Sequence, residues 1–153
     1  MSNAVWRFKS GEQTDLFVKL FSIAASRIRA VQENRHRAVL VPVPASTREK
    51  HRTRYEAFCR KLSADMGVAD GYGAITVAYD RAQYKGTHGN GDRTANLEFT
   101  ERSGEGASLL VDDVLTTGAT FIALRRKLIR YGAKFVIGMF LAKTIAFEDG
   151  RKE

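Results

Sequence analysis

The sequence is poor in cysteine and proline and contains no long apolar run. Cys59 is the only cysteine among 153 residues, so the chain cannot form an internal disulfide or a cysteine-based zinc site. A reducing, cytoplasmic location is therefore expected. No apolar run approaches the roughly 20 residues that a membrane-spanning helix needs, so we expect no membrane partner.

Acidic residues are also scarce relative to basic ones. The chain has 17 Asp and Glu against 25 Lys and Arg, which gives a formal net charge of +8. This excess predicts a polyanionic partner, such as a nucleic acid, an anionic membrane or a phosphorylated metabolite. Hydrophobic residues make up 44% and charged residues 27%, and these values argue against a disordered chain because both are close to globular averages. No repeat or linker divides residues 1–153, so we expect a single domain.

Apolar patterns of helical and strand type alternate along the chain. This alternation predicts an α/β fold with a mostly parallel sheet flanked by helices. Thr14 or Asp15 is expected to cap the first helix, Gly67 to end the second, and the first strand to stop near Pro42. Residues 80–106 are polar and rich in glycine, which predicts a long flexible loop that acts as a lid. The predicted helices span 14–31, 55–66 and 117–131, and the predicted strands span 38–43, 73–79, 108–111 and 134–142.

The segment 109-LLVDDVLTTGAT-120 carries the most specific chemistry. A buried strand leads into two adjacent carboxylates, Asp112 and Asp113, and then into a threonine- and glycine-rich turn that opens a helix. Gly118 allows successive N–H groups to converge on one anion, and the helix adds the positive end of its dipole. The carboxylates can accept hydrogen bonds from sugar hydroxyls or lie beside Mg²⁺. The alternative is that a threonine only caps the helix and the carboxylates are solvated, but the combination favours a phosphate site.

This segment resembles the phosphoribosyl-diphosphate (PRPP) motif of type I phosphoribosyltransferases, and it differs from a Walker A loop and from a Rossmann fingerprint. The stretch 40-LVPVPAS-46, followed by the basic segment 48–67, is similar to the strand and pyrophosphate loop of the ComF-like branch of that family. The stretch 83–99 is similar to the flexible loop of the same branch. The resemblance implies a type I phosphoribosyltransferase-like core over residues 38–143, with residues 1–35 as a helical segment that is a candidate partial hood.

The resemblance also implies a role for each part of the site. Asp112 and Asp113 are the implied catalytic carboxylates and would take the 2′- and 3′-hydroxyls of the ribose. Mg²⁺ is the implied cofactor, carried largely by PRPP and lying near this pair rather than in a metal site of the protein. The Thr/Gly turn would hold the 5′-phosphate, and a second turn would cradle the pyrophosphate. These turns are Thr116, Thr117, Gly118, Ala119 and Thr120, and Pro44, Ala45 and Ser46, respectively.

Further residues complete the implied enzyme. Arg81, Lys85 or Arg93 would reach the pyrophosphate with the flexible loop, and Lys143 is the candidate for recognising a base. The implied reaction transfers the phosphoribosyl group from PRPP to a nucleobase or another nitrogen acceptor and releases pyrophosphate. The excess positive charge is then interpreted as an attractive field for this phosphorylated substrate. We expect the protein to be a homodimer.

Two departures from the ComF-like pattern keep other functions open. The single cysteine excludes the zinc module of that branch, and the usual Arg-Gly-Phe-Asn-Gln run reads 53-TRYEA-57. One alternative is a regulatory protein that binds PRPP or a nucleotide without turnover. The other is a competence-type protein associated with nucleic acid, although no nucleic-acid-binding motif is present.

The remaining charged and reactive residues are expected to be structural. The basic run 48–54 is predicted to be a solvated face, from which one or two side chains can meet pyrophosphate. Cys59 is predicted to lie in the core, and the three histidines lack the spacing of metal ligands. The basic residues of the last helix are expected to complement its dipole. They are Arg125, Arg126, Lys127 and Arg130.

Overall fold

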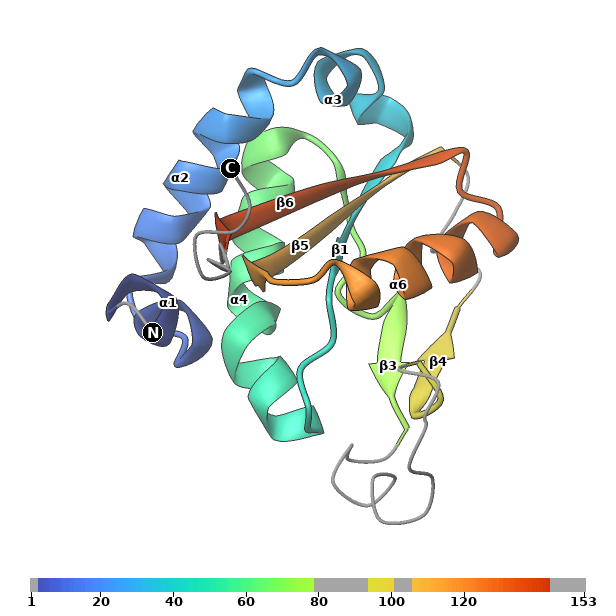
Figure 1. Ribbon diagram of the computed structural model, residues 1–153. Coiled ribbons are helices and arrows are strands. Elements are labelled where there is room, and N and C mark those ends of the chain that lie inside the picture. Colours follow the sequence, from blue (N-terminus) through green and yellow to red (C-terminus); the bar gives the residue numbers. More distant parts are fainter. Residues whose placement is uncertain (1–2, 79–93, 101–105, 144–153) are drawn as a thin grey trace, which may run out of the picture.

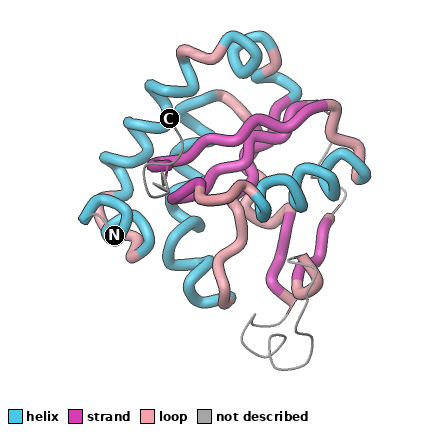
Figure 2. Tube along the Cα trace, viewed as in Figure 1, coloured by secondary structure: helices cyan, strands magenta, loops and turns pink. Residues whose placement is uncertain are grey.

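The computed structural model describes residues 3–78, 94–100 and 106–143 and shows an α/β fold (Figure 1). Helices and strands both occur along this part of the chain, and the helices pack beside the strands (Figure 2). In chain order the elements are α1 (Asn3–Lys9), α2 (Thr14–Ser26), α3 (Arg29–Glu33), the 3-10 helix η1 (Arg35–Arg37), β1 (Ala38–Pro42), α4 (Arg48–Met66), β2 (Ala69–Asp70), β3 (Ile75–Val77), β4 (Leu97–Phe99), β5 (Ala107–Leu115), α6 (Ala119–Arg130) and β6 (Phe135–Lys143).

The main sheet is parallel throughout. Its strand order is β2-β1-β5-β6, and the register pairs Leu40 of β1 with Leu109 of β5 and Leu109 with Ile137 of β6. β3 and β4 form a separate antiparallel pair. The predicted α/β class, with a mostly parallel sheet flanked by helices, is confirmed, and the arrangement is consistent with a type I phosphoribosyltransferase-like fold. Because the strands are parallel, their carboxyl ends meet at one edge of the sheet.

Each face of the sheet is covered by its own hydrophobic core. Successive strand residues point to opposite faces, so Leu40 belongs to the core under α1, α2 and α4, while Val41 belongs to the core under α6 and the β3-β4 pair. Phe8 of α1 packs against Phe17, Phe21 and Phe58 in the first core. The sheet thus separates α6 from the N-terminal helices (Figure 1).

The predicted first helix is two helices. α2 ends at Ser26, and α3 begins after Ile28, whose backbone is extended. Neither Thr14 nor Asp15 caps the start, so that prediction was wrong. The N-cap residue is Gln13, which has a left-handed backbone and makes no side-chain cap, and the Thr14 hydroxyl donates to the Gly11 carbonyl instead.

The prediction of a loop over residues 80–106 was wrong for the described residues 97–99. Residues 97–99 form β4, which pairs with β3. Ile75 of β3 belongs to the core under α6, and Leu97 and Phe99 of β4 pack against the same core. β3 is also shorter than the predicted strand 73–79 and stands outside the main sheet. Residues 80–93 and 101–105 of the predicted loop lie outside the described residues.

Other predicted boundaries are close to the observed ones. β1 ends at Pro42, and α4 ends at Gly67, which adopts the left-handed conformation that terminates many helices. α4 begins earlier than predicted because the Thr47 hydroxyl accepts a hydrogen bond from the backbone N–H of Lys50. In the described part of the chain, no helix is both long and apolar enough to cross a membrane.

Candidate functional site

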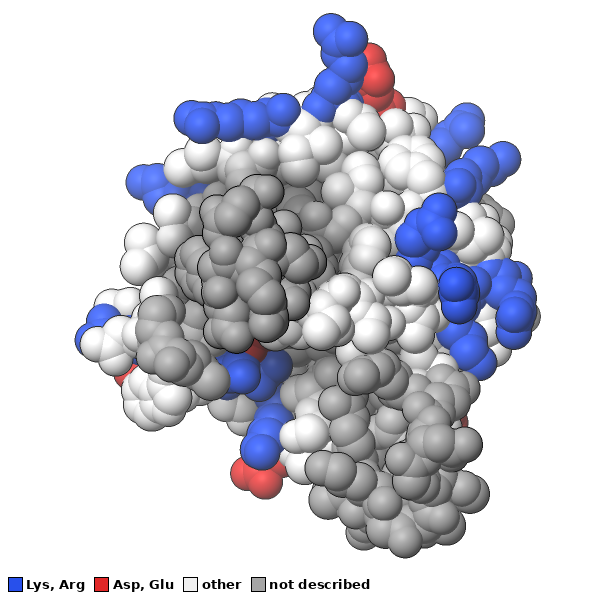
Figure 3. All heavy atoms as spheres, in the orientation of Figure 1, with Lys and Arg blue, Asp and Glu red and all other residues white. Residues whose placement is uncertain are grey.

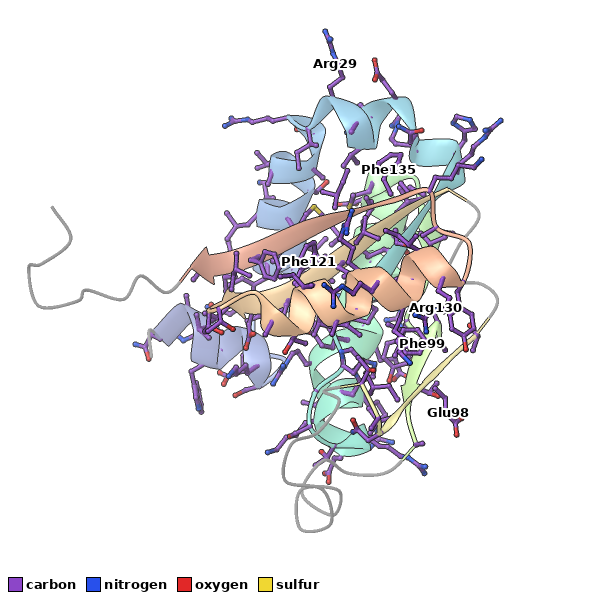
Figure 4. The ribbon with its side chains drawn as sticks, turned by 45° about the vertical axis from the view of Figure 1, so that its right-hand side comes forward. Arg29, Glu98, Phe99, Phe121, Arg130 and Phe135 are labelled. Carbon is purple, nitrogen blue, oxygen red and sulfur yellow. The ribbon has the colours of Figure 1, made fainter. Side chains whose placement is uncertain are left out.

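The predicted phosphate turn, acidic pair and pyrophosphate loop meet at the carboxyl ends of β1 and β5. Together they line a cavity of about 280 Å³ at the N-terminus of α6. Phe121 of α6 and Phe140 of β6 form one wall, with their rings 5.8 Å apart and nearly perpendicular. Figure 4 shows Phe121 between α6 and the sheet. The polar lining consists of Lys9, Ser46, Arg54, Asp112, Asp113, Thr116 and Thr120.

The two carboxylates lie within β5 rather than after it. β5 continues to Leu115, so Asp112 pairs with Phe140 of β6 in the ladder. The prediction that the strand ends at Val111 was therefore wrong. Pairing along β6 carries the strand four residues further, and this holds both aspartates on the sheet, which is a more rigid support than a loop.

Each carboxylate has specific partners. The Tyr55 hydroxyl of α4 donates to Asp112 Oδ1 over 3.1 Å, and the backbone N–H of Asp113 donates to the same atom over 2.8 Å. The backbone N–H of Val114 donates to Asp113 Oδ1 over 2.7 Å. Asp113 Oδ2 lies 3.2 Å from Lys9 Nζ and 4.0 Å from an Arg54 nitrogen, so it is held by two cations.

Sequence reasoning missed Lys9. It lies at the end of α1, and no motif connects that short helix with the PRPP-like segment more than 100 residues later. Arg54 was expected on a largely solvated face, but its side chain is only 12% exposed, and its guanidinium lies 5.5 Å from the centre of the Tyr55 ring. The position of Arg54 after the pyrophosphate loop was the only available signal.

The two aspartates have opposite pKa shifts. Burial, together with the hydrogen bond and charge of Asp113, raises the pKa of Asp112 to about 7. Burial also acts to raise the pKa of Asp113, but hydrogen bonds from Asp112 and Val114 and the charges of Arg54 and Lys9 outweigh it and lower that pKa. Below about pH 7 the pair therefore holds one proton, mainly on Asp112.

The Thr/Gly turn has the backbone of an anion-binding loop but not every donor is available. Gly118 is the N-cap of α6 and has φ +83°, a conformation that favours glycine. Thr117 accepts a hydrogen bond from the backbone N–H of Ala119 over 3.2 Å. Thr116, Gly118 and Thr120 line the cavity, whereas Thr117 and Ala119 are not among its lining residues.

The predicted pyrophosphate loop borders the same cavity. Pro44 and Ala45 are buried, and Ser46 is half-buried. The backbone N–H of Ala45 donates to His51 Nδ1 over 3.3 Å, so this donor points to α4 rather than to the cavity. His51 was expected on a solvated face, but it is only 6% exposed, and burial lowers its pKa to about 4.

Several other predicted residues have structural positions. The guanidinium of Arg48 donates to the carbonyls of Val77 and Ala78, which joins α4 to the β3 strand. Cys59 is fully buried as predicted, and burial raises the pKa of its thiol. Within the described ranges, no group of three or more His, Cys, Asp or Glu side chains is arranged to hold a metal.

The predicted flexible-loop and base-recognition residues have no described side chains. Arg81, Lys85 and Arg93 lie outside the described residues. Lys143 is the last residue of β6 and is paired with Leu115 of β5, and its side chain is outside the described part.

The basic residues of α6 lie far from the cavity. Arg126 and Arg130 are exposed in the C-terminal half of the helix, whereas its N-terminus borders the cavity. Figure 3 shows Lys and Arg side chains gathered on this side of the molecule, and Figure 4 shows Arg130 at the far end of α6. At about 1.5 Å per residue, Arg130 is roughly 15 Å along the helix from Thr120. Among the described basic residues, only Lys9 and Arg54 line the cavity.

No known protein-family model matches this chain. No curated protein matches its sequence either.

Proposed function

We propose that this protein is a Mg²⁺-dependent phosphoribosyltransferase that binds PRPP and transfers its phosphoribosyl group to a nucleobase or another nitrogen acceptor. One observation carries the proposal. An acidic pair and the glycine-capped helix N-terminus that follows it line one cavity with a proline-containing turn from a distant part of the sequence, at the carboxyl edge of a parallel sheet. Ligands of open α/β sheets bind at this edge. A cytoplasmic location, which the single cysteine predicts, belongs to the same proposal.

The cavity offers suitable groups for each part of PRPP. Thr116, Gly118 and Thr120 would hold the 5′-phosphate, helped by the dipole of α6. Asp113, ionised, would accept a hydrogen bond from a ribose hydroxyl, while Asp112, protonated over much of the acid range, can donate as well as accept. Ser46 is the best-placed side chain of the second turn for the pyrophosphate.

The chemistry requires control of charge. Displacement at C1 of the ribose breaks its bond to pyrophosphate, forms a bond to the acceptor nitrogen, and passes through an oxocarbenium-like state. Lys9 and Arg54 would support the negative charge on the leaving group. The two carboxylates are hard oxygen ligands that suit Mg²⁺, but both already have protein partners. Mg²⁺ would therefore be held mainly by pyrophosphate oxygens, near Asp112 and Asp113.

The proposal is tested by Asp113→Asn. Replacing the carboxylate removes a charged acceptor for a ribose hydroxyl, so the Kd for PRPP with Mg²⁺ should rise about 10- to 100-fold. Isothermal titration measures this change, and a pyrophosphate-release assay with a panel of purine and pyrimidine bases measures turnover. Asp65→Asn is the matched control, because it makes the same chemical change at an exposed position on α4. It should leave both the Kd for PRPP and the turnover unchanged.

The outcomes separate the alternatives. Wild-type binding of PRPP without pyrophosphate release on any base would favour a regulatory protein. Unchanged or tighter PRPP binding by Asp113→Asn would overturn the assignment of Asp113 to a ribose hydroxyl, because its carboxylate would then serve only to hold Lys9 and Arg54. Thermal unfolding of each variant confirms that a loss of binding is not a loss of fold.

A second candidate function rests on the basic half of α6. Exposed Arg126 and Arg130 are followed by Tyr131, which is 44% exposed and stacks on Phe99 at 5.5 Å. Cations beside an exposed aromatic ring suit a nucleic-acid strand, whose phosphates and bases need both. This surface is remote from the cavity, so the two functions are compatible and separately testable.

A further inference from the structure

α2 exposes apolar side chains on the side that faces away from the protein core. Leu16, Leu20 and Ile23 are 48%, 46% and 44% exposed. Their spacing of four and three residues places them in one row along the helix, which we name the apolar stripe. The opposite side of α2 is buried through Phe17, Val18, Phe21 and Ala25.

The stripe is not explained by the fold of one chain. A helix at the surface of a globular protein usually carries polar residues on its outer side. In Figure 1, α2 lies at the outer edge of the molecule, with α4 on its inner side. Trp6 of the preceding helix is also 55% exposed. A continuous apolar row on an outer helix indicates a contact with another molecule.

The charges at the two ends of α2 indicate which molecule fits. Glu12 lies just before the N-terminus and Arg27 is the C-cap residue. Asp15 is already paired with Lys61 at 2.8 Å, whereas none of the described ion pairs includes Glu12 or Arg27. A second α2 lying antiparallel would place each acidic end beside a basic end, and the two helix dipoles would also be opposed favourably.

The register supports the same partner. If Leu16 faces the partner's Ile23, then Leu20 lies near the twofold axis and Glu12 is level with the partner's Arg27. The stripe and its flanking charges are therefore complementary to a second copy. Apolar side chains face apolar side chains, and each acidic residue faces a basic one. Such self-complementarity is what a twofold symmetric interface requires.

We propose that a second copy of this chain docks on the apolar stripe, so that α2 packs antiparallel against the partner's α2 in a twofold symmetric homodimer. The contact buries Leu16, Leu20 and Ile23 from both chains and pairs Glu12 with the partner's Arg27. The stripe and the cavity are on different elements, so the dimer does not depend on the proposed phosphoribosyltransferase activity.

Sedimentation velocity over a wide range of protein concentration tests the dimer. The wild-type chain should sediment as a dimer, and Leu20→Glu should raise the dissociation constant by about 100-fold or more, because a charge is placed at the centre of the contact. Ile122→Glu on α6 is the matched control, since Ile122 is also 46% exposed. It should remain dimeric.

A charge exchange tests the antiparallel register. Arg27→Glu places two acidic side chains together and should weaken the dimer about tenfold, while the double variant Glu12→Arg/Arg27→Glu should restore it. A monomeric wild-type chain, or a dimer that Leu20→Glu does not weaken, would overturn the proposal. A dimer broken by Ile122→Glu instead would place the interface on α6 and would also overturn it. Circular dichroism confirms that each variant is folded.

Discussion

At the scale of single residues, two groups in and beside the cavity have pKa values that are shifted in opposite directions. Asp112 has a pKa raised to about 7, mainly by burial, and His51 has a pKa lowered to about 4, also mainly by burial. Both are therefore neutral over much of the range between these values. Asp112 lines the cavity from β5, and His51 lies behind the Ala45 turn, from whose backbone N–H it accepts a hydrogen bond.

The pKa of Asp112 predicts that Asp112→Asn gains stability relative to the wild type as pH rises. Because the folded pKa is above the unfolded value, the unfolded chain releases this proton first, and wild-type stability falls as pH rises from about 4 to about 7. Asparagine does not titrate, so the free energy of unfolding of the variant relative to wild type should increase by up to about 1.4 kcal/mol per pH unit. Urea unfolding at several pH values measures the difference.

His51→Gln is the counterpart, with the opposite sign. The folded pKa of His51 is below its ordinary value of 6.5, so its contribution to stability is present above that pH and is lost as pH falls towards about 4. The variant should therefore gain stability relative to wild type as pH falls. The same urea unfolding measures this difference. If the free energy of unfolding of either variant follows the same pH dependence as wild type, the replaced group does not titrate in this range and its assignment is contradicted.

At the scale of elements, the amino ends of β1 and β5 approach closely at a glycine. A Cβ added to Gly106 would lie 2.1 Å from the carbonyl oxygen of Arg37, which is a backbone atom and cannot rotate away. The carbonyl of Gly106 also accepts a hydrogen bond from the N–H of Lys134, just before β6. Gly106 therefore brings the starts of three neighbouring strands together.

Gly106→Ala should destabilise the protein by about 1–3 kcal/mol or more, because the two backbones must separate. Gly73→Ala is the control, since a Cβ at Gly73 would meet no atom within 4 Å and its φ is not positive. It should be nearly neutral. Chemical unfolding of both variants measures the change, and equal stability of the two would show that the starts of β1 and β5 move apart without cost.

At the scale of the whole molecule, the length of α6 separates the two charged features. The cavity lies at the carboxyl edge with Lys9 and Arg54, whereas Arg126 and Arg130 lie towards the other end of α6. The net charge of +8 is therefore not gathered around the proposed PRPP site in the described part of the chain. A separate role of the α6 surface can be tested without disturbing the cavity.

The double variant Arg126→Glu/Arg130→Glu should bind a single-stranded oligonucleotide more weakly than wild type and with a smaller dependence on salt, because two phosphate contacts are lost. Its Kd for PRPP should not change. Fluorescence anisotropy with a labelled oligothymidylate at low and physiological salt measures the first effect. Arg29→Glu/Arg60→Glu, which reverses two exposed charges on α3 and α4, serves as a charge control, and equal weakening by that control would indicate only a general charge effect. If the wild-type chain does not bind the oligonucleotide even at low salt, the nucleic-acid function is excluded.

How far the sequence could predict the site depended on distance along the chain. The acidic pair and the Thr/Gly turn are recognisable because their chemistry is contained in adjacent residues, 109–120. Glycine at the start of α6 follows from the backbone conformation that only glycine adopts readily. Lys9 and the Tyr55 hydroxyl have no local signal, because their importance comes from contacts with Asp113 and Asp112 across the sequence.

The sequence by itself determined the α/β class, the parallel sheet, the end of β1 at Pro42 and the end of α4 at Gly67, since periodicity and backbone preference are local properties. Only the tertiary structure decided that β5 extends through the aspartates, because pairing with β6 holds it in the ladder. Packing likewise decided that His51 is buried and neutral rather than solvated and charged. Burial and long-range pairing depend on which residues meet in space, and no local pattern records that.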